Sequence, residues 1–264
     1  MNALVSYERF AIATAEKAGK LLLRHFRHGA NRVKNKAYGD EVSEVDFASD
    51  RLIQKLITTR FPDHKILSEE SSPNFDARGA MIWTVDPLDG TTNYLMGNPL
   101  FGVNLALVNH GEILVGVIEL PFVRHHYVAH EGGGARCDGK RIHVSRTKKL
   151  DAARVFMCHK RTPMDIRFGV KMYDALAHRI PHVRFYGAAS VEFVMIAEGS
   201  ADAFILGGPL VWDVAPGTLL VREASGRVTD ERGRDWRPGM QPKVMVVSNG
   251  KIHAQLLSLV KKSL

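Results

Sequence analysis

An apolar run that ends in two closely spaced aspartates places the tightest limit on how this chain can fold. Met81 to Val85 has the composition of a buried strand, and Asp86 and Asp89 follow it in a turn formed by Pro87 and Gly90. Two threonines and an asparagine come directly after this turn. A surface turn would explain the proline and the glycine, but not the second aspartate, the hydroxyls and the amide together. Carboxylates at the end of a buried strand, beside small residues and hydroxyls, favour a hard-cation site with room for a phosphate.

The composition is that of an ordinary globular protein. The chain has 264 residues, of which 45% are hydrophobic and 24% charged, enough for one large domain or two intimate ones. No stretch approaches the roughly eighteen consecutive apolar residues of a membrane span, and we expect no signal peptide because no basic region precedes an apolar run at the start. Cys137 and Cys158 are isolated, which favours reduced thiols and a cytoplasmic location.

The formal net charge of +8 favours anionic partners, namely phosphorylated metabolites, nucleic acid or acidic protein surfaces. The densest basic stretch is Lys140 to Lys149, which contains no interleaved aromatic residue. A solvated strand edge and loop explains this stretch better than a nucleic-acid site does. The charge by itself leaves both alternatives open.

Periodicity predicts helices and strands in the first half of the chain. Apolar residues spaced three or four apart predict a helix from Ala11 to about His28, and Ser43 to Asp46 resembles a capping box that opens a second helix. Phe61-Pro62 ends that helix. A polar loop is expected from Asn31 to Gly39. Strands are predicted at residues 65–67, 81–85, 102–108, 113–118, 126–129 and 142–145.

After about residue 150, helices and strands alternate. The pattern predicts strands at residues 155–158, 183–186, 203–206 and 244–248, and helices at 166–177, 189–198, 213–224 and 252–260. We therefore expect an N-terminal α+β half over residues 1–150 and a C-terminal α/β half over residues 151–264, packed as one compact unit. The chain has no Gly-x-Gly-x-x-Gly and no Walker-type phosphate loop, so nucleotide hydrolysis and dinucleotide binding have no support.

The segment from Asp86 to Tyr94 resembles the signature Asp-Pro-x-Asp-Gly-Thr-x-Asn-aromatic of the inositol monophosphatase family, whose members are magnesium-dependent, lithium-sensitive phosphatases. Other elements of that family have similar segments here, in the same order: Asp40–Asp46, Ile66–Ser71, Gly132–Ala135, Gly187–Ser190, Trp212–Gly217 and Glu223–Gly226. The resemblance spans nearly the whole chain.

The resemblance implies a fold and an activity. The expected fold is a layered αβαβα sandwich of the inositol monophosphatase/fructose-1,6-bisphosphatase type, usually a homodimer. The expected reaction is Mg²⁺-dependent hydrolysis of inositol-1-phosphate, or of a related polyol or sugar phosphate, by water activated at the metal. Fructose-1,6-bisphosphate, histidinol phosphate and 3′-phosphoadenosine nucleotides are alternative substrates. Because some bacterial proteins that resemble this family bind RNA polymerase in antitermination, a binding role with RNA polymerase or RNA is a non-enzymatic alternative.

The acidic residues themselves argue for divalent cations. Carboxylates alone would repel a phosphate monoester, so Glu69, Asp86, Asp89 and Asp213 can act together only if cations overcompensate their charge. All-oxygen ligation suits Mg²⁺, and the lack of histidine in this set argues against zinc or copper there.

By resemblance, two or three Mg²⁺ ions bind in the site. Glu69, Asp86 and the Leu88 carbonyl hold one ion, and Asp86, Asp89 and Asp213 hold the second. Asp46 supports a weaker third. The resemblance assigns catalysis to Glu69, Thr91 and Asp46. The residues expected to bind substrate are Asp89, Gly90, Thr91, Thr92, Arg184, Gly187, Ala188, Ala189 and Asp213.

Several of these residues also have simpler explanations. Asp213 could be the N-cap of the helix expected from 213 to 224, and Asp46 could be only a capping-box carboxylate. Members that act on inositol phosphates have an acid at the position of Leu206, so the leucine argues against strict inositol specificity. Arg184 could instead reach a polyol or a second anionic group.

Overall fold

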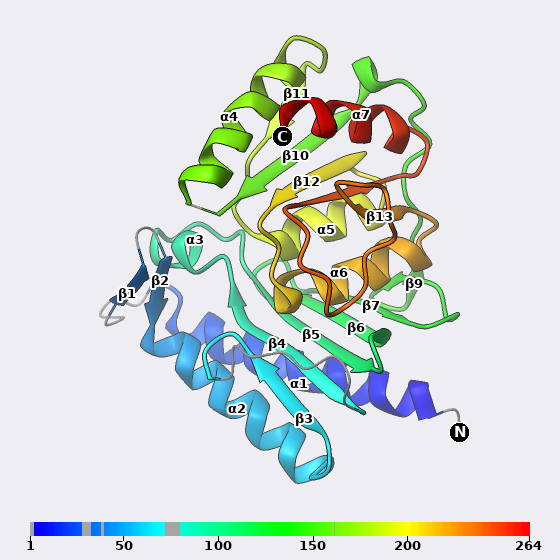
Figure 1. Cartoon of the computed structure of the whole chain (residues 1–264). Coiled ribbons are helices and arrows are strands. Elements are labelled where there is room, and N and C mark those ends of the chain that lie inside the picture. Colours follow the sequence, from blue (N-terminus) through cyan, green and yellow to red (C-terminus); the bar gives the residue numbers. More distant parts are fainter. Residues whose placement is uncertain (1–2, 28–32, 38–39, 72–79, 161) are drawn as a thin grey trace.

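Two β-sheets and three layers of helices alternate through the molecule (Figure 1). The computed structural model describes residues 3–27, 33–37, 40–71, 80–160 and 162–264. The layers follow the order helix, sheet, helix, sheet, helix, which is the expected αβαβα arrangement.

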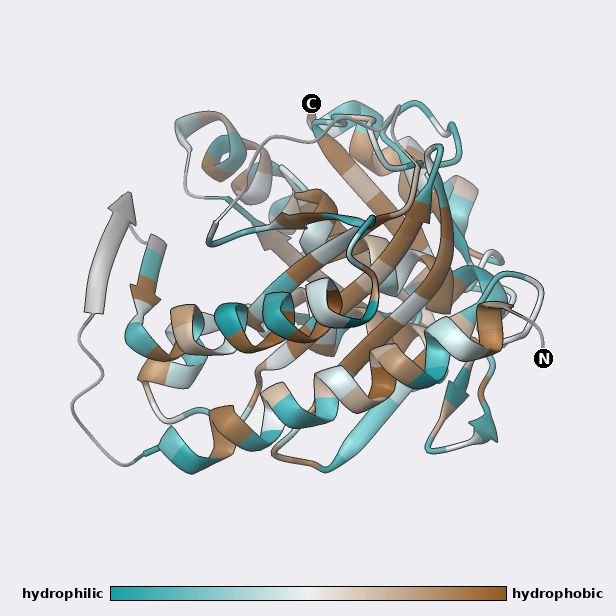
Figure 2. Cartoon of the chain, turned by 90° about the horizontal axis from the view of Figure 1, so that it is seen from below, coloured by the Kyte–Doolittle hydropathy of each residue, from teal (hydrophilic) through white to brown (hydrophobic). Residues whose placement is uncertain are grey.

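The outer helices of the first layer are α1 (Ala3–His25) and α2 (Glu44–Arg60). Helix α1 buries Ala11, Ala15, Ala18 and Leu22, which recur every three or four residues and therefore share one face. The expected capping box at the start of α2 is confirmed, and α2 ends one residue before Phe61. Figure 2 shows both helices crossing in front of strands that are mostly apolar.

The larger sheet has seven strands in sequence order, and only its first pair is parallel. Its strands are β3 (Lys65–Ser68), β4 (Ile82–Asp89), β5 (Gly102–Asn109), β6 (Glu112–Leu120), β7 (His125–His130), β8 (Arg136–Cys137) and β9 (Lys140–Arg141). Every residue of β4 is buried because helices cover both faces of the sheet. The apolar run therefore ends, at Asp86 and Asp89, inside the molecule.

Helices α5 (Ala189–Ala197) and α6 (Val211–Glu223) form the middle layer. Helix α6 begins two residues before Asp213, so Asp213 lies in the first turn and is not the N-cap. Pro216 is the sixth helical residue and therefore lies inside the helix. The helix packs tightly on the larger sheet, since a Cβ at Gly116 would lie 2.9 Å from the Pro216 backbone.

The second sheet has five strands in the order β11-β10-β12-β14-β13. Its strands are β10 (Arg154–His159), β11 (His182–Arg184), β12 (Ala203–Gly207), β13 (Arg227–Asp230) and β14 (Val244–Ser248). Helices α4 (Pro163–Ala177) and α7 (His253–Ser263) cover its outer face. Strand β13 was not predicted.

Two sequence predictions for the first half of the chain were wrong, one of a loop and one of a strand. The supposed polar loop contains β1 (Val33–Ala37), which pairs with β2 (Asp40–Ser43); residues 31–32 and 38–39 lie outside the described part. No strand forms at 142–145, because the chain leaves the sheet after β9 and continues to the short 3₁₀ helix at Leu150–Ala152.

The largest apolar cluster joins the two sheets through the middle helices, and includes Ala106 and Ile118 from one sheet and Phe204 and Met245 from the other. This shared core favours one compact unit, while the boundary near residue 150 stays a prediction. None of the helices within the described ranges is both long enough and apolar enough to cross a membrane.

Candidate metal and phosphate site

The centre of the site is the end of β4, where the regular pairing with β5 is interrupted. Asp86 pairs with Asn104 and Asp89 with Gly102, so the chain bulges between the two aspartates. The Leu88 N–H donates a hydrogen bond to Asp86 Oδ1 at 3.0 Å and fixes this carboxylate. Both aspartates are buried, with exposed fractions of 2% and 8%.

Three elements that are distant in the sequence bring acidic side chains together here. Glu69 follows β3, and its N–H donates to the Val85 carbonyl at 3.1 Å, which continues the parallel pairing with β4. Asp213 comes from the first turn of α6. One carboxylate oxygen from each of Glu69, Asp86 and Asp213 lies within 4.8 Å of the others. The structure thus brings together three of the four carboxylates that were expected to converge, and the role of the site stays a prediction.

Burial and mutual repulsion make this cluster costly in its ionised form. Burial raises the pKa of Asp86 well above its ordinary value, and the charges of Glu69, Asp89 and Asp213 raise it further. Burial also raises the pKa of Asp213, together with Glu69 and Asp89, while nearby Lys160 lowers it. In the described part of the chain, no lysine or arginine forms an ion pair with Asp86 or Asp213.

A second group of hydrogen bonds connects α2 to the turn after β4. The Thr91 hydroxyl lies 2.9 Å from Asp46 Oδ1 and 3.1 Å from the Leu88 carbonyl oxygen, so its hydrogen can be donated to either. The Ser43 N–H donates to Asp46 Oδ2 at 2.9 Å. Asp46 therefore belongs to the capping box of α2 and also contacts Thr91, while its metal-binding and catalytic roles stay predictions. Burial raises the pKa of Asp46, although these hydrogen bonds oppose the shift.

The start of α5 closes the other side of the site. The N–H groups of Ala189 and Ser190 donate to the Asp89 carboxylate at 3.2 and 2.7 Å, and the Ser190 hydroxyl donates to it as well. A Cβ on Gly90 would lie 3.0 Å from the Ala188 Cβ, so these two residues are in close approach. Burial raises the pKa of Asp89 although the Ser190 and Ala189 hydrogen bonds oppose the shift.

Most of the predicted substrate residues lie around this turn. Gly90 has a left-handed φ of 84° and precedes α3 (Thr91–Leu95), which includes Thr92. Asn93 donates to the Tyr186 carbonyl at 2.7 Å and lies 3.9 Å from the Cβ that Gly187 would carry.

Arg184 lies apart from these residues. It is exposed at the end of β11, where its guanidinium donates to the Val183 carbonyl at 2.9 Å. It lines a separate cavity of about 200 Å³. None of its contacts within the described residues reaches the carboxylates.

The sequence interpretation missed two residues at this site. Ser190 was quoted in the Gly-Ala-Ala-Ser segment but given no role, although its hydroxyl and N–H bind Asp89. Lys160 was not considered because a lone lysine after a strand carries no signal of its own. It lines a cavity of about 540 Å³ with Gly208, Leu210 and Trp212, beside Asp213.

The donor set suits a hard divalent cation. Every side-chain donor of the group Glu69, Asp86 and Asp213 is a carboxylate, and no histidine or cysteine belongs to it. A clustered negative charge with oxygen donors is the environment that Mg²⁺ prefers. The arrangement can bind cations beside backbone N–H groups that an anionic ester could approach.

Comparisons with known proteins agree with this geometry. The model of the inositol monophosphatase family matches residues 4–264. A Thermotoga maritima protein named fructose-1,6-bisphosphatase/inositol-1-monophosphatase is 32% identical over 253 residues, which are 96% of this chain and 95% of the relative. A Xylella fastidiosa protein named Nus factor SuhB is 36% identical over 236 residues, 88% of this chain and 84% of the relative. The crystal structure of extragenic suppressor protein suhB from Bartonella henselae has a TM-score of 0.91 at 29% identity, covering 98% of this chain and all of that one. The expected αβαβα fold is therefore confirmed.

Proposed function

Because this chain belongs to the inositol monophosphatase family, we propose that it hydrolyses a small phosphate monoester with Mg²⁺, acting on inositol-1-phosphate or a related polyol or sugar phosphate. The observation that supports this most is the convergence of Glu69, Asp86 and Asp213 within 4.8 Å. A chain that kept the family fold for another purpose would have no need to bring three carboxylates so close together.

The proposed ligands follow from the site geometry and the family resemblance. Glu69, Asp86 and the Leu88 carbonyl would hold one Mg²⁺, and Asp86, Asp89 and Asp213 a second. Asp46 would support a third. Bound Mg²⁺ would neutralise the carboxylates, polarise the phosphate and lower the pKa of the attacking water.

The chain's own groups would position the reactants. Thr91, whose hydrogen is held by Asp46 or the Leu88 carbonyl, can accept a hydrogen bond from the attacking water and orient it. Glu69 would accept the proton of that water. The N–H groups of Gly90 and Thr91 lie at the start of α3, where a helix offers them no intrahelical acceptor, and would bind the phosphate oxygens.

A phosphatase panel tests this proposal. Phosphate release from inositol-1-phosphate, sugar phosphates and bisphosphates is measured with Mg²⁺, after exhaustive chelation, and with Li⁺ added. We expect activity to require Mg²⁺ and to fall with Li⁺. Equal activity after chelation would contradict the proposal. Turnover of inositol-1-phosphate far below that of other monoesters would refute only the inositol assignment.

The substrate side argues for a broader specificity than inositol phosphates. Leu206 is 6% exposed and packs in the core cluster, so it offers no acceptor for ring hydroxyls. Lys160, in the cavity beside Asp213, places a cation where a second phosphate could bind. A bisphosphate is therefore the second candidate substrate, in keeping with the name of the Thermotoga relative. Lys160→Gln should raise KM for fructose-1,6-bisphosphate more than for a monophosphate.

A binding role in transcription is the non-enzymatic candidate. The Xylella relative is named a Nus factor, and Lys148, Lys149 and Arg179 line a basic surface cavity in this chain. Such a surface suits RNA or an acidic protein. If Asp86→Asn abolished turnover and left a cellular phenotype intact, the binding role would be favoured over catalysis.

We retain two further expectations as proposals. A homodimer is supported by the exposed apolar side chains Met164, Val170, Tyr173 and Phe185 on α4 and after β11. A monomeric mass in solution would contradict it. A cytoplasmic location is supported by the free thiols of both cysteines.

A further inference from the structure

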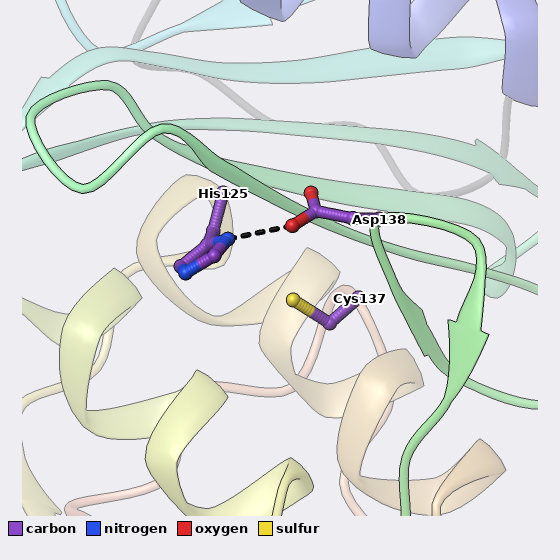
Figure 3. Close-up of side chains that lie close together, drawn as sticks. All are labelled: His125, Cys137 and Asp138. Carbon is purple, nitrogen blue, oxygen red and sulfur yellow. Dashed lines mark hydrogen bonds and ion pairs between the residues drawn. The ribbon is translucent and has the colours of Figure 1, made fainter.

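A second cluster of metal-ligating side chains lies away from the proposed catalytic site. His125 at the start of β7, Cys137 at the end of β8 and Asp138 just after it each offer a ligand atom, and these atoms lie within 4.8 Å of one another. Figure 3 shows the three side chains meeting above helices of the middle layer.

Strand pairing positions these side chains. Tyr127 and Cys137 are opposite each other in the antiparallel pair β7–β8, so their side chains share a face. His125 is two residues before Tyr127 and therefore points to the same face. Asp138 has a left-handed φ of 47°, which turns the chain back toward β9 and brings its carboxylate over β7.

The Asp138 carboxylate holds the cluster together. Its Oδ2 lies 2.6 Å from His125 Nδ1, and its Oδ1 accepts a hydrogen bond from the His126 N–H at 3.0 Å. The imidazole and the carboxylate are thus arranged before any ligand arrives. His125 and Asp138 are exposed and Cys137 is half-buried, so an ion from solvent can reach all three.

The local charge is negative although the chain as a whole is basic. Glu198 accepts a hydrogen bond from the Tyr127 hydroxyl at 2.8 Å and lies close to Cys137. No lysine or arginine among the described residues forms an ion pair with Asp138 or Glu198. This potential attracts a cation.

A cysteine nucleophile is the other chemistry that such a trio suggests, and the surroundings disfavour it. Burial and the neighbouring Asp138 charge together raise the pKa of the Cys137 thiol to about 11. A reactive cysteine needs a lowered pKa, from cationic neighbours or a helix N-terminus. A metal ion can still displace the thiol proton, since it supplies the positive charge that the site lacks.

We propose that His125, Cys137 and Asp138 form a binding site for a zinc-class divalent cation, with water as the fourth ligand. One nitrogen, one sulfur and one oxygen donor suit Zn²⁺ or Co²⁺ in tetrahedral geometry and do not suit Mg²⁺. Zn–S and Zn–N bonds of about 2.3 and 2.1 Å place tetrahedral donors about 3.6 Å apart. Donors already within 4.8 Å therefore need shifts of about 1 Å, with the ion replacing the hydrogen between His125 and Asp138.

This site is separate from the acidic cluster and goes beyond the proposed phosphatase activity. Glu198 follows the last residue of α5, whereas Ala189 at the first residue binds Asp89. The nine-residue helix between them is about 13 Å long. Metal binding at one site can therefore be measured with the other already filled.

Co²⁺ titration of the whole protein tests this site, with Mg²⁺ in large excess to saturate the acidic cluster. Bound Co²⁺ has a thiolate-to-metal absorption band only when sulfur is a ligand, so oxygen sites do not contribute to it. We expect one such band per chain in the wild-type protein, with Zn²⁺ displacing the Co²⁺. A wild-type protein without the band, or with Co²⁺ that Zn²⁺ does not displace, overturns the proposal.

The two cysteines provide a matched pair of variants. Cys137→Ser should abolish the band, and Cys158→Ser should retain it, because Cys158 lies on β10 in the other sheet. His125→Ala should weaken Co²⁺ binding at least about tenfold. A band that persists in Cys137→Ser, or unchanged affinity in His125→Ala, overturns the assignment of these ligands, and circular dichroism confirms that each variant is folded.

Discussion

Two buried aspartates in this molecule, Asp86 and Asp230, have opposite surroundings. Asp230, at the end of β13, is fully buried and accepts hydrogen bonds from the N–H groups of Arg232 and Arg234 at 2.9 Å and from the Arg234 guanidinium at 2.7 Å. Burial alone would raise its pKa, but these donors outweigh it and lower the pKa. Within the described residues, Asp86 accepts one hydrogen bond, from the Leu88 N–H, and three other carboxylates help to raise its pKa.

The Asp230 carboxylate stabilises the fold, whereas the charge of the Asp86 carboxylate destabilises it. At Asp230, the folded state supplies donors that the unfolded chain lacks, so ionisation favours folding. At Asp86, ionisation opposes folding until a cation arrives. Charges kept in such unfavourable surroundings are typical of functional sites, where activity is gained at the expense of stability.

The same substitution at the two positions gives the sharpest test, and Asp86→Asn has the largest expected effect. We expect kcat/KM for phosphate release to fall at least about 10³-fold, roughly 4 kcal/mol, because a shared ligand of two proposed Mg²⁺ ions is lost. The unfolding free energy of the metal-free protein should rise by about 1 kcal/mol as repulsion is relieved. Retained turnover, measured by released phosphate, would remove Asp86 from the catalytic site.

Mg²⁺ binding should stabilise the protein in a pH-dependent way. At Mg²⁺ one hundred times the Kd, the unfolding free energy should rise by roughly 2.7 kcal/mol. Burial raises the pKa values of Asp86, Asp89 and Asp213, and the charges of neighbouring carboxylates raise those of Asp86 and Asp213 further. The folded metal-free chain therefore loses stability as the pH rises through those values. The Mg²⁺ effect should therefore be larger at pH 8 than at pH 5.

Thermal melts with and without Mg²⁺ at both pH values measure this effect, with Asp86→Asn as the control that removes it. If Mg²⁺ stabilised wild type and Asp86→Asn equally, the ion would bind at a site other than the acidic cluster.

Asp230→Asn is the matched substitution in the other region. We expect the unfolding free energy to fall by about 2 kcal/mol, because the charge-assisted bonds to Arg234 and the turn are weakened. Urea denaturation measures the loss, and phosphate release should stay at the wild-type rate. A variant as stable as wild type would show that the ionised Asp230 carboxylate does not stabilise the fold.

The smallest expected effect concerns the buried histidine His253. Its contribution to the unfolding free energy changes with pH in the direction opposite to that of the acidic cluster. His253 contacts the hydroxyls of Thr229 and Ser248, and burial lowers its pKa to about 4. Its stabilising contribution is complete above pH 6.5 and is lost as the pH falls toward 4. At pH 5.5 the loss should be roughly 1.4 kcal/mol, from the 1.36 kcal/mol per pKa unit.

The pH-dependent contribution of His253 is measured by comparing the unfolding free energies of wild type and His253→Gln from pH 7.5 to 5.5. Parallel profiles would mean that His253 is not held neutral in the fold.

Local sequence patterns predicted much of the fold and of the proposed site. The apolar run before Asp86 predicted β4, Ser43 to Asp46 predicted a capping box, and the acidic residues predicted a convergent cluster; all three have the expected geometry. These features depend on periodicity, caps and turn residues, which act over a few neighbouring residues. The roles assigned to the acidic residues stay predictions.

Long-range packing explains what the sequence interpretation missed. Ser190 binds Asp89 across 101 positions of the chain, and Lys160 reaches the surroundings of Asp213 across 53. Helix α6 begins at Val211, so Asp213 lies inside its first turn. No local sequence signal specified this start. Such pairs arise only when separate layers pack together.

The sequence by itself determined the individual strands and helices and the motifs that resemble the inositol monophosphatase family, because these are encoded locally. The order of the layers followed from that resemblance. Only the tertiary structure decided that His125, Cys137 and Asp138 meet, and that Asp230 receives more donors than Asp86 does from the described part of the chain. Both outcomes depend on strand register and on which groups burial leaves near a charge, and these are properties of the packed chain rather than of any segment.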